Sequence, residues 1–231
     1  LDRSSAASDV YKRQKLGCAL ENPGDRFAFL YALADPTFTL GAGQIRLSDA
    51  GKLMALAAYG KNGDIDEDAR HIITTLLDNN LNFRKLHKRL FQNNIYYNIG
   101  LDDPRLATLA HHLSNAIFNL FRDFVQEIVF DRAPLLIVGG CGLNCDWNSK
   151  WIETQLFTDV FIPPCTNDSG SAIGTAIDAL LHTKGIAKIT WSPYAGELSQ
   201  NDTDNTGTFI SEPYDIPVSY THLTLPTSDL V

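Results

Sequence analysis

The chain has 231 residues, of which 44% are hydrophobic and 20% are charged, and its formal net charge is -8. This composition excludes a disordered chain, and no run of about 18 apolar residues predicts a membrane-spanning helix. The negative charge argues against nucleic acid or an anionic membrane as the main partner. Four cysteines are too few for a disulfide scaffold of this size, and no signal peptide is visible, so we expect a cytoplasmic protein.

The two ends of the sequence differ from its middle. Residues 1–14 and 217–231 show no helical or strand periodicity that continues into their neighbours. Their sequences resemble translated adapter or vector sequence, and such segments are set aside in reasoning about a fold. We therefore expect the native protein to lie between residues 15 and 216.

Three helical regions are expected in the first half of the chain. Residues 51–60 form a short run of helix-forming residues bracketed by glycines, and residues 64–92 give two further helical stretches. In the second stretch we expect a solvated basic face over an apolar one. The basic face holds Arg84, Lys85, Lys88 and Arg89, and the apolar face holds Leu86, Leu90 and Phe91.

The strongest helix is predicted over residues 104–130. Asp103 and Pro104 are a typical helix start, and apolar residues then recur every three or four positions. His111 and His112 are adjacent on this helix and point in different directions. A shared metal needs histidines four positions apart, so we expect both to be structural.

The second half of the chain predicts an α/β arrangement. A short apolar strand over residues 134–138 runs into a glycine-rich turn and a helix over about 145–156. A second strand over 159–164 runs into the polar turn 166–171, where Asp168 or Ser169 is the expected N-cap of another apolar helix. Strand, turn and helix repeated in this order are typical of nucleotide-binding folds, in which backbone amides approach a phosphate.

Two common nucleotide fingerprints do not fit. The third glycine of a dinucleotide fingerprint falls at Cys145, and the acidic residue expected about 20 positions later is replaced by Pro163, Pro164 and Cys165. No Gly-Lys-Ser/Thr of a P-loop is present. A fold in which two separate glycine-containing turns hold the nucleotide suits the sequence better.

The segments LLIVGGCGLNCDWNSKW and DVFIPPCTNDSGSAIGTAIDALL, with GKLMALAAYG upstream and WSPYAGE downstream, resemble the O-carbamoyltransferases of nodulation-factor and antibiotic biosynthesis. The resemblance covers about residues 15–198. It implies an incomplete α/β domain of the sugar-kinase/actin-like (ASKHA) nucleotide-binding fold over 15–190. Residues 191–216 would then be a linker or the start of a YrdC-like domain.

The resemblance also implies a reaction. Carbamoyl phosphate and ATP give carbamoyl adenylate in the YrdC-like domain, and the ATPase-like domain passes the carbamoyl group to a hydroxyl of a sugar-like or natural-product acceptor. Gly139, Gly140 and Asn144 match the turn that holds the adenylate; their alternative role is a tight turn that needs glycine.

Asp168 matches a catalytic, metal-binding carboxylate of the family, and iron or magnesium would suit it. Its alternative role is a helix N-cap. Gly170 and Gly174 would let the helix start approach the phosphate, or else allow close helix packing. Lys52 would offset phosphate charge as a catalytic residue, or simply reach solvent from a helix end.

Two features of the family are not found in this sequence. The HxxxH-type segment that supplies the remaining metal ligands does not precede Lys15, and the YrdC-like domain does not follow Trp191. Two other functions therefore stay open. One is a sugar or acid kinase of the same fold, and the other is a fragment without catalytic activity that binds nucleotide weakly or not at all.

Overall fold

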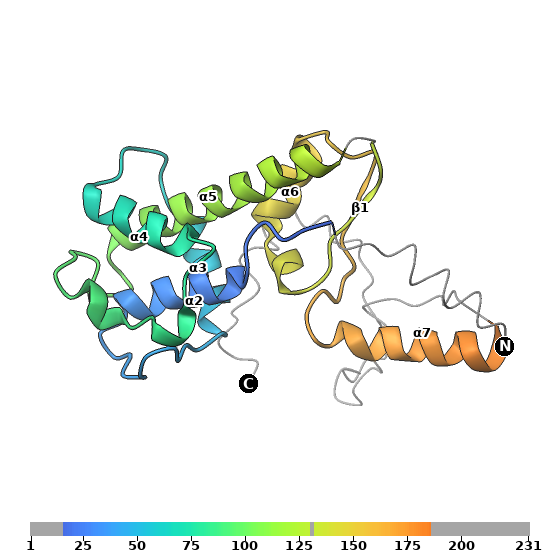
Figure 1. The fold of residues 1–231 in the computed structure, drawn as a ribbon, viewed down its shortest axis with the longest axis horizontal. Helices are drawn as coiled ribbons and strands as arrows, with labels where there is room; N and C mark the ends of the chain where they lie inside the picture. The colour runs from blue at the N-terminus through green and yellow to red at the C-terminus, as the bar shows by residue number, and fades with distance from the viewer. Residues whose placement is uncertain (1–15, 130–131, 186–231) are drawn as a thin grey trace, which may run out of the picture. The chain divides into compact units, whose positions relative to one another are not determined.

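The computed structural model describes residues 16–129 and 132–185. It divides the chain into two compact units, the first ending at Ile162 and the second beginning at Pro163. Figure 1 shows the helices and strands of both. The two tails and the segment 191–216, for which the sequence predicts foreign ends and a linker, lie outside the described residues.

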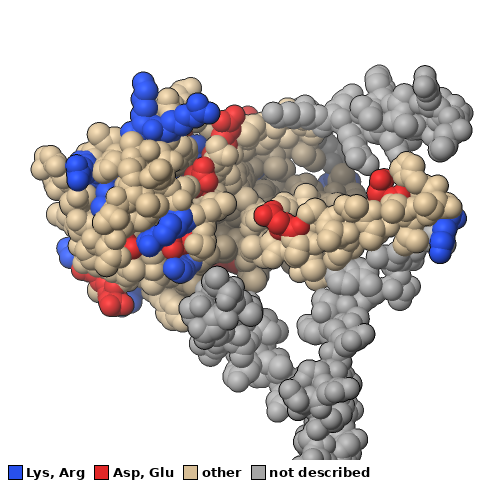
Figure 2. All heavy atoms as spheres, turned by 90° about the horizontal axis from the view of Figure 1, so that it is seen from below, with Lys and Arg blue, Asp and Glu red and all other residues tan. Residues whose placement is uncertain are grey.

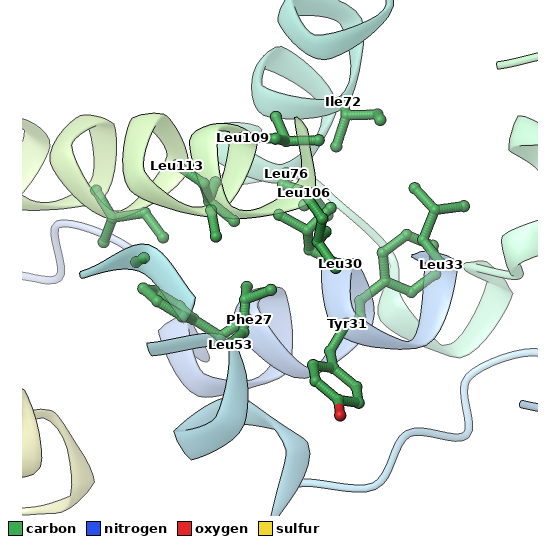
Figure 3. Packing of buried hydrophobic residues seen from close by; sticks show 14 of the residues in the cluster. Phe27, Leu30, Tyr31, Leu33, Leu53, Ile72, Leu76, Leu106, Leu109 and Leu113 are labelled. Atoms are coloured by element: carbon green, nitrogen blue, oxygen red, sulfur yellow. The ribbon is translucent and has the colours of Figure 1, made fainter. Parts of the chain in front are cut away.

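Four helices form the core of the first unit: α2 (Pro23–Ala34), α3 (Asp49–Ala57), α4 (Glu67–Leu77) and α5 (Pro104–Ile128). Their side chains meet in one cluster, shown in Figure 3. The cluster includes fully buried residues from all four helices, among them Leu30, Leu33, Leu53, Ile72, Leu76, Leu106, Leu109 and Leu113.

Helix α2 lies at the centre of this core and is buried on every side from Arg26 to Ala34. The sequence analysis did not assign it, because a helix that is apolar all round lacks the 3.6-residue alternation that marks an amphipathic helix. Arg26 is its one buried charge. The guanidinium donates to the carbonyl oxygens of Leu76 and Asp78, where α4 ends, and so supplies donors that the last turn of α4 lacks.

The helix starts predicted from the sequence are confirmed for α5, and α4 begins in a similar way. Asp103 is the N-cap of α5, and its Oδ1 accepts a hydrogen bond from the Arg105 amide at 2.9 Å. Helix α4 lies within the first of the two predicted stretches, and Asp66 caps it through the Ala69 amide at 2.7 Å. The long helix therefore begins where it was expected and ends at Ile128.

Helices α3 and α5 approach each other closely at the end of α3. A Cβ at Gly60 would collide with His111 and with the carbonyl oxygen of Ala107, so this position requires glycine. His111 Nδ1 lies 3.2 Å from the Ala57 carbonyl oxygen and donates to it. His111 thus links the two helices, which confirms its structural role.

The basic segment after α4 corrects one expectation. Residues 81–92 form two short 3-10 turns, η1 (Phe83–Lys85) and η2 (Lys88–Phe91), in place of a helix. Lys88, expected in solvent, is buried, and Leu90, expected inside, is 70% exposed. The Lys88 ammonium donates to the carbonyl oxygen of Asp35 at 2.6 Å and to Asn98 Oδ1 at 2.7 Å. Leu86 and Phe91 are buried as expected. Because the tighter turn rotates successive side chains differently, Lys88 and Leu90 differ from the places that a helix would give them.

The predicted α/β order is present at the end of the first unit. Strands β1 (Leu135–Leu136) and β2 (Val160–Phe161) pair in parallel, with Leu135 opposite Val160 and Leu136 opposite Phe161. The turn η3 (Gly140–Leu143) and helix α6 (Cys145–Glu153) connect them. One face of this pair packs towards the core through Leu135, whereas Leu136 and Phe161 on the other face are each 59% exposed.

Helix α6 packs against the end of α5 through aromatic side chains, and Figure 1 shows the two side by side. Trp151 lies 4.9 Å from Phe118 and Trp147 lies 5.5 Å from Phe121, measured between ring centroids. The Trp147 indole N–H also donates to Ser114 Oγ at 3.0 Å. These contacts fix the turn that precedes α6 to the helical core.

The second unit contains helix α7 (Gly170–Lys184), with Ser169 at its N-cap position. In the described part of the chain, no helix is both long and apolar enough to cross a membrane. On the face drawn in Figure 2, basic and acidic side chains are interspersed over the first unit. This face therefore carries no large patch of a single sign.

Replacing Lys88 by methionine is expected to lower the free energy of unfolding by about 1–3 kcal/mol. The substitution keeps the volume of the side chain but leaves the buried Asp35 carbonyl without its ammonium donor. Urea denaturation measures the loss, with exposed Lys85→Met as the matched control. A K88M protein as stable as the control would contradict the role given to Lys88.

Tyr96 is expected to make stability depend on alkaline pH. Burial and the hydrogen bond that its hydroxyl donates to Asp66 Oδ2 at 3.0 Å raise the pKa of Tyr96 to about 12. The folded state therefore keeps a proton that the unfolded state loses, so this contribution is complete below about pH 10 and disappears as the pH rises through about 12.

Denaturation of wild type and Tyr96→Phe across this range tests the pH effect. The difference in stability between them should shrink between pH 10 and 12. The control is Tyr59→Phe, because Tyr59 is 71% exposed. A difference that stays constant would show that the Tyr96 hydroxyl does not couple folding to pH.

Candidate functional site

The predicted glycine turn lies between β1 and α6. Gly139 has φ 82° and ψ 177°, a conformation that is essentially confined to glycine. Gly139 and Gly140 are both exposed. Among the described residues, neither the Gly140 nor the Cys141 amide donates a hydrogen bond. The turn therefore has two backbone N–H groups without an acceptor among the described residues, and such groups can bind phosphate oxygens.

Asn144, the third residue predicted at this turn, has a structural task. It is buried, and its side-chain oxygen accepts a hydrogen bond from the Trp147 amide at 3.2 Å as the N-cap of α6. The structure thus brings Gly139, Gly140 and Asn144 together on one turn. The amide oxygen of Asn144 is already used there, so a nucleotide contact would have to come from its NH₂ group.

The other predicted phosphate and metal residues lie in the second unit. Asp168 is exposed just before α7, and no hydrogen bond to its carboxylate is found among the described residues. The helix start has no side-chain cap. Gly170 packs tightly, because a Cβ there would collide with the Cys165 carbonyl oxygen, whereas a Cβ at Gly174 would meet nothing. Tight packing therefore accounts for Gly170, whereas the metal-binding role of Asp168 stays a prediction.

Lys52 lies on α3, where it belongs to a network of charges. Its ammonium is 3.0 Å from Asp49 Oδ1 and 5.6 Å from the centre of the Tyr31 ring. Asp49 is 1% exposed and also accepts from Arg46 Nε at 2.7 Å. The described contacts of Lys52 are with this network, and its side chain is half exposed. Its catalytic role stays a prediction.

Asp35 anchors the other side of the same network. Burial raises its pKa, but hydrogen bonds from Thr37 and Arg46 outweigh burial and hold the pKa of this carboxyl below its ordinary value. Arg46 bridges the two buried carboxylates, with 2.6 Å to Asp35 Oδ2. This network was not predicted from the sequence, although Arg46, Asp49 and Lys52 are spaced three residues apart and that spacing was an available signal. Asp35 lies eleven positions before Arg46, so no local pattern includes it.

The described residues do not complete a metal site. Among them, no three His, Cys, Asp or Glu side chains lie close enough together to hold an ion. Asp168 supplies a hard carboxylate donor, but Ca²⁺ and Mg²⁺ sites need further oxygen ligands. The geometry described here therefore supports Asp168 as one ligand at most.

Most of the chain matches one known protein family. The family described as "Carbamoyltransferase N-terminus" matches residues 22–177, which is more than half of the chain. The chain belongs to this carbamoyltransferase family. The match contains the turn, both strands and Asp168, so the resemblance carried by these motifs is confirmed at the level of the family.

Individual relatives agree with the family match. The carbamoyltransferase chain is 44% identical over 184 residues to a 3'-hydroxymethylcephem-O-carbamoyltransferase of Amycolatopsis lactamdurans, covering 80% of this chain and 35% of the relative. It is 51% identical over 67 residues to nodulation protein U of Rhizobium tropici, which covers 29% of this chain and 12% of that protein. The chain thus spans about a third of the length of the cephem relative. No solved structure matches it.

One polar residue beside the carbamoyltransferase turn, Asn148, was not predicted from the sequence to belong to the site. Asn148 donates from its amide nitrogen to the Gly142 carbonyl oxygen at 2.8 Å, and its Oδ1 is buried without a donor among the described residues. The second asparagine in LNCDWN, one helical turn after Asn144, was the available signal. Cys141, nearby, is unsuited to act as a nucleophile, because burial raises the pKa of its thiol.

Paired substitutions test the geometry of the carbamoyltransferase turn. Gly139→Ala should lower the free energy of unfolding by about 1–3 kcal/mol, because alanine is strained at φ 82°. Gly140→Ala is the control, since a Cβ there meets nothing within 4 Å. Thermal or urea denaturation measures both. Equal losses would argue against the left-handed conformation at Gly139.

Proposed function

We propose that this chain is the nucleotide-binding part of an O-carbamoyltransferase. The family match and the names of the relatives support carbamoyl transfer. The order strand, glycine turn, helix, strand, turn and helix supports an incomplete sugar-kinase/actin-like nucleotide-binding domain. The observation that carries the proposal is the exposed turn at Gly139 and Gly140, in a family that transfers carbamoyl groups. The Gly140 and Cys141 amides of this turn donate no hydrogen bond among the described residues.

The proposed reaction has two stages. In a YrdC-like domain of the parent enzyme, carbamoyl phosphate is hydrolysed to carbamate and phosphate. A carbamate oxygen then attacks the α-phosphorus of ATP, so that carbamoyl adenylate forms and pyrophosphate leaves. An acceptor hydroxyl then forms a bond to the carbamoyl carbon, the bond between that carbon and the phosphate oxygen of AMP breaks, and the hydroxyl proton passes to a base. AMP leaves with the electron pair of the broken bond.

The task of this chain is to hold the leaving group. Backbone N–H groups of Gly140 and Cys141 would donate to the phosphate of AMP, where negative charge grows as the bond breaks. Glycine at both positions before Cys141 lets a phosphate approach the backbone without a clash with Cβ. Fixing the adenylate beside the acceptor also removes part of the entropic barrier to transfer.

Iron or magnesium remains part of the proposal for the parent enzyme. A bound divalent ion would polarise the carbamoyl carbonyl and lower the pKa of the acceptor hydroxyl. Of the residues described here, Asp168 would be one ligand. Since the described residues do not complete the site, the other ligands would have to come from elsewhere in the parent.

A sugar or acid kinase of the same fold would release ADP, whereas carbamoyl transfer through the adenylate releases AMP. The family match favours transfer. We further propose that the 231-residue chain alone carries out no carbamoyl transfer and binds nucleotide weakly. Calorimetry with ATP and AMP tests this, and a sub-micromolar dissociation constant would contradict it.

The role of Asp168 is tested in a full-length parent enzyme. Asp168→Ala should reduce carbamoyl transfer at least about 100-fold, because it removes a carboxylate from the proposed transfer site, and should spare adenylate formation in the YrdC-like domain. Chromatography of the carbamoylated acceptor and of carbamoyl adenylate measures the two steps separately.

Asp178→Ala is the matched control for this prediction. Asp178 is an exposed carboxylate on α7, the helix that follows Asp168, with a side chain 72% exposed. The control should retain both steps. Unchanged transfer by D168A would remove Asp168 from the site, and loss of both steps in D168A would indicate a general defect of folding.

A further inference from the structure

A continuous chain of hydrogen bonds links α3 to α6 through side chains of α5. His111 Nδ1 lies 3.2 Å from the Ala57 carbonyl oxygen, and His111 Nε2 lies 2.9 Å from Asn115 Nδ2. The Oδ1 of Asn115 accepts from the Lys150 ammonium of α6. Lys150 also donates to Asp146 Oδ2, within α6, at 2.6 Å. These contacts connect three helices through polar groups.

The chemistry of each group fixes the position of the proton on His111. An ammonium can only donate, so the atom of Asn115 that faces Lys150 is its oxygen. The NH₂ group of Asn115 must then face His111 Nε2, which accepts from it. The imidazole proton therefore lies on Nδ1 and is donated to the Ala57 carbonyl oxygen. In this arrangement His111 is neutral, and both of its nitrogens have partners.

An acceptor for a protonated His111 is already in place. Asn62 Oδ1 lies 2.8 Å from the same Nε2. Asn62 is exposed, and its side chain makes no other hydrogen bond among the described residues, so its amide can turn to present the oxygen. A nitrogen that carries a proton would donate to Asn62, whereas a nitrogen without one accepts from Asn115. The two protonation states of His111 therefore use different partners.

A proton on Nε2 would disturb the contact with α6. The proton would face the NH₂ group of Asn115, and two donors repel each other. Asn115 cannot avoid this by turning over, because its NH₂ group would then face the Lys150 ammonium in place of the oxygen. Either movement of Asn115 therefore breaks its hydrogen bond with Lys150. Histidine side chains ordinarily change charge between about pH 5 and 8.

The described contacts of His111 include few other charges. The titratable neighbour on α5 is His112, whose ring centroid lies 5.9 Å from that of His111. Helix α6 contributes Lys150 through Asn115, with Asp146 beside it. The contacts on the side of α3 are a backbone carbonyl group and a side-chain amide, and both are uncharged. In the described part of the chain, Lys150 is therefore the charge that the hydrogen bonds join to His111.

We propose that His111, Asn115 and Lys150 form a pH-sensitive switch. Neutral His111 holds Asn115 in the orientation that binds Lys150, whereas protonated His111 donates to Asn62 and Lys150 is released from α5. The element that the switch controls is α6, whose N-cap is Asn144 of the carbamoyltransferase turn. Acid pH should therefore loosen the helix that follows the turn. The proposal does not depend on nucleotide binding.

Hydrogen exchange of the full 231-residue chain tests the switch, read by mass spectrometry over α6, Cys145–Glu153. Protection is expressed relative to the intrinsic exchange rate at each pH. In the wild type it should fall about tenfold from about pH 7.5 to about pH 5.5, the effect of losing one hydrogen bond to a charged group.

Asn115→Asp should reverse the sign of this effect. A carboxylate at this position accepts from Lys150 and also from a protonated Nε2, so the protection of α6 should rise as the pH falls. Asn119→Asp is the matched control, because it adds the same charge at an exposed position one turn further along α5. It should behave like the wild type. Both variants keep His112, so the comparison separates the switch from titration of that residue.

Lys150→Met supplies an independent test if the Asn115→Asp protein does not fold. It removes the ammonium that the switch releases, so the protection of α6 should lie near the acid level of the wild type at both pH values. Wild-type protection that stays constant over this range overturns the switch. So does an N115D protein that loses protection as N119D does, or a K150M protein that still shows the tenfold fall.

Discussion

A helix that is buried on every side must find hydrogen-bond donors for its last carbonyl groups within the protein itself. Helix α2 meets this requirement. The Tyr31 carbonyl accepts from Asp35, those of Leu33 and Ala34 accept from the amides of Asn98 and Gly100, and Lys88 donates to the Ala32 carbonyl at 3.4 Å. The first unit is assembled around this helix end, because donors from two distant segments converge on it beside the adjacent Asp35.

The geometry of those segments follows from the same constraint. Asn98 and Gly100 have φ 56° and 100°, and this turn directs their amides at the end of α2. The positive end of the Lys88 side chain lies where the helix dipole is negative. Burial lowers the pKa of Lys88, and the negative charge of the nearby Asp35 opposes this effect. The helix end and the Asp35 charge therefore both favour the buried ammonium.

A part of this fold could be predicted from the sequence only where the residues that determine it are neighbours along the chain. Neighbouring residues determine three features that the structure confirms. These are the N-cap at Asp103, the long apolar stripe of α5 and the strand, turn and helix around Gly139. Helix α2 carries no periodicity, so its burial could not be told from its sequence. Lys88 was placed in solvent because the two carbonyl groups to which it donates, those of Ala32 and Asp35, lie more than fifty positions away.

In the candidate site, too, the features set by neighbouring residues could be predicted and those set by distant contacts could not. A glycine-rich turn after a strand is recognisable from spacing, and the family match confirms the resemblance. Which of two asparagines caps the helix and which has an unused oxygen depends on three-dimensional contacts of Asn144 and Asn148. Asp168 and the turn lie in different units. The motif that contains them therefore identifies the family but describes no contact between them in this structure.

The bare outer face of the two-stranded sheet has a consequence for the behaviour of the chain at high concentration. Leu136 and Phe161 are neighbours across the strands, and Val138 follows at 64% exposure. Exposed apolar side chains on short parallel strands are a template for pairing with a second copy. The same residues that place the glycine turn therefore make self-association the chief solubility hazard of this polypeptide, and charged residues beside Leu136 would act as gatekeepers against it.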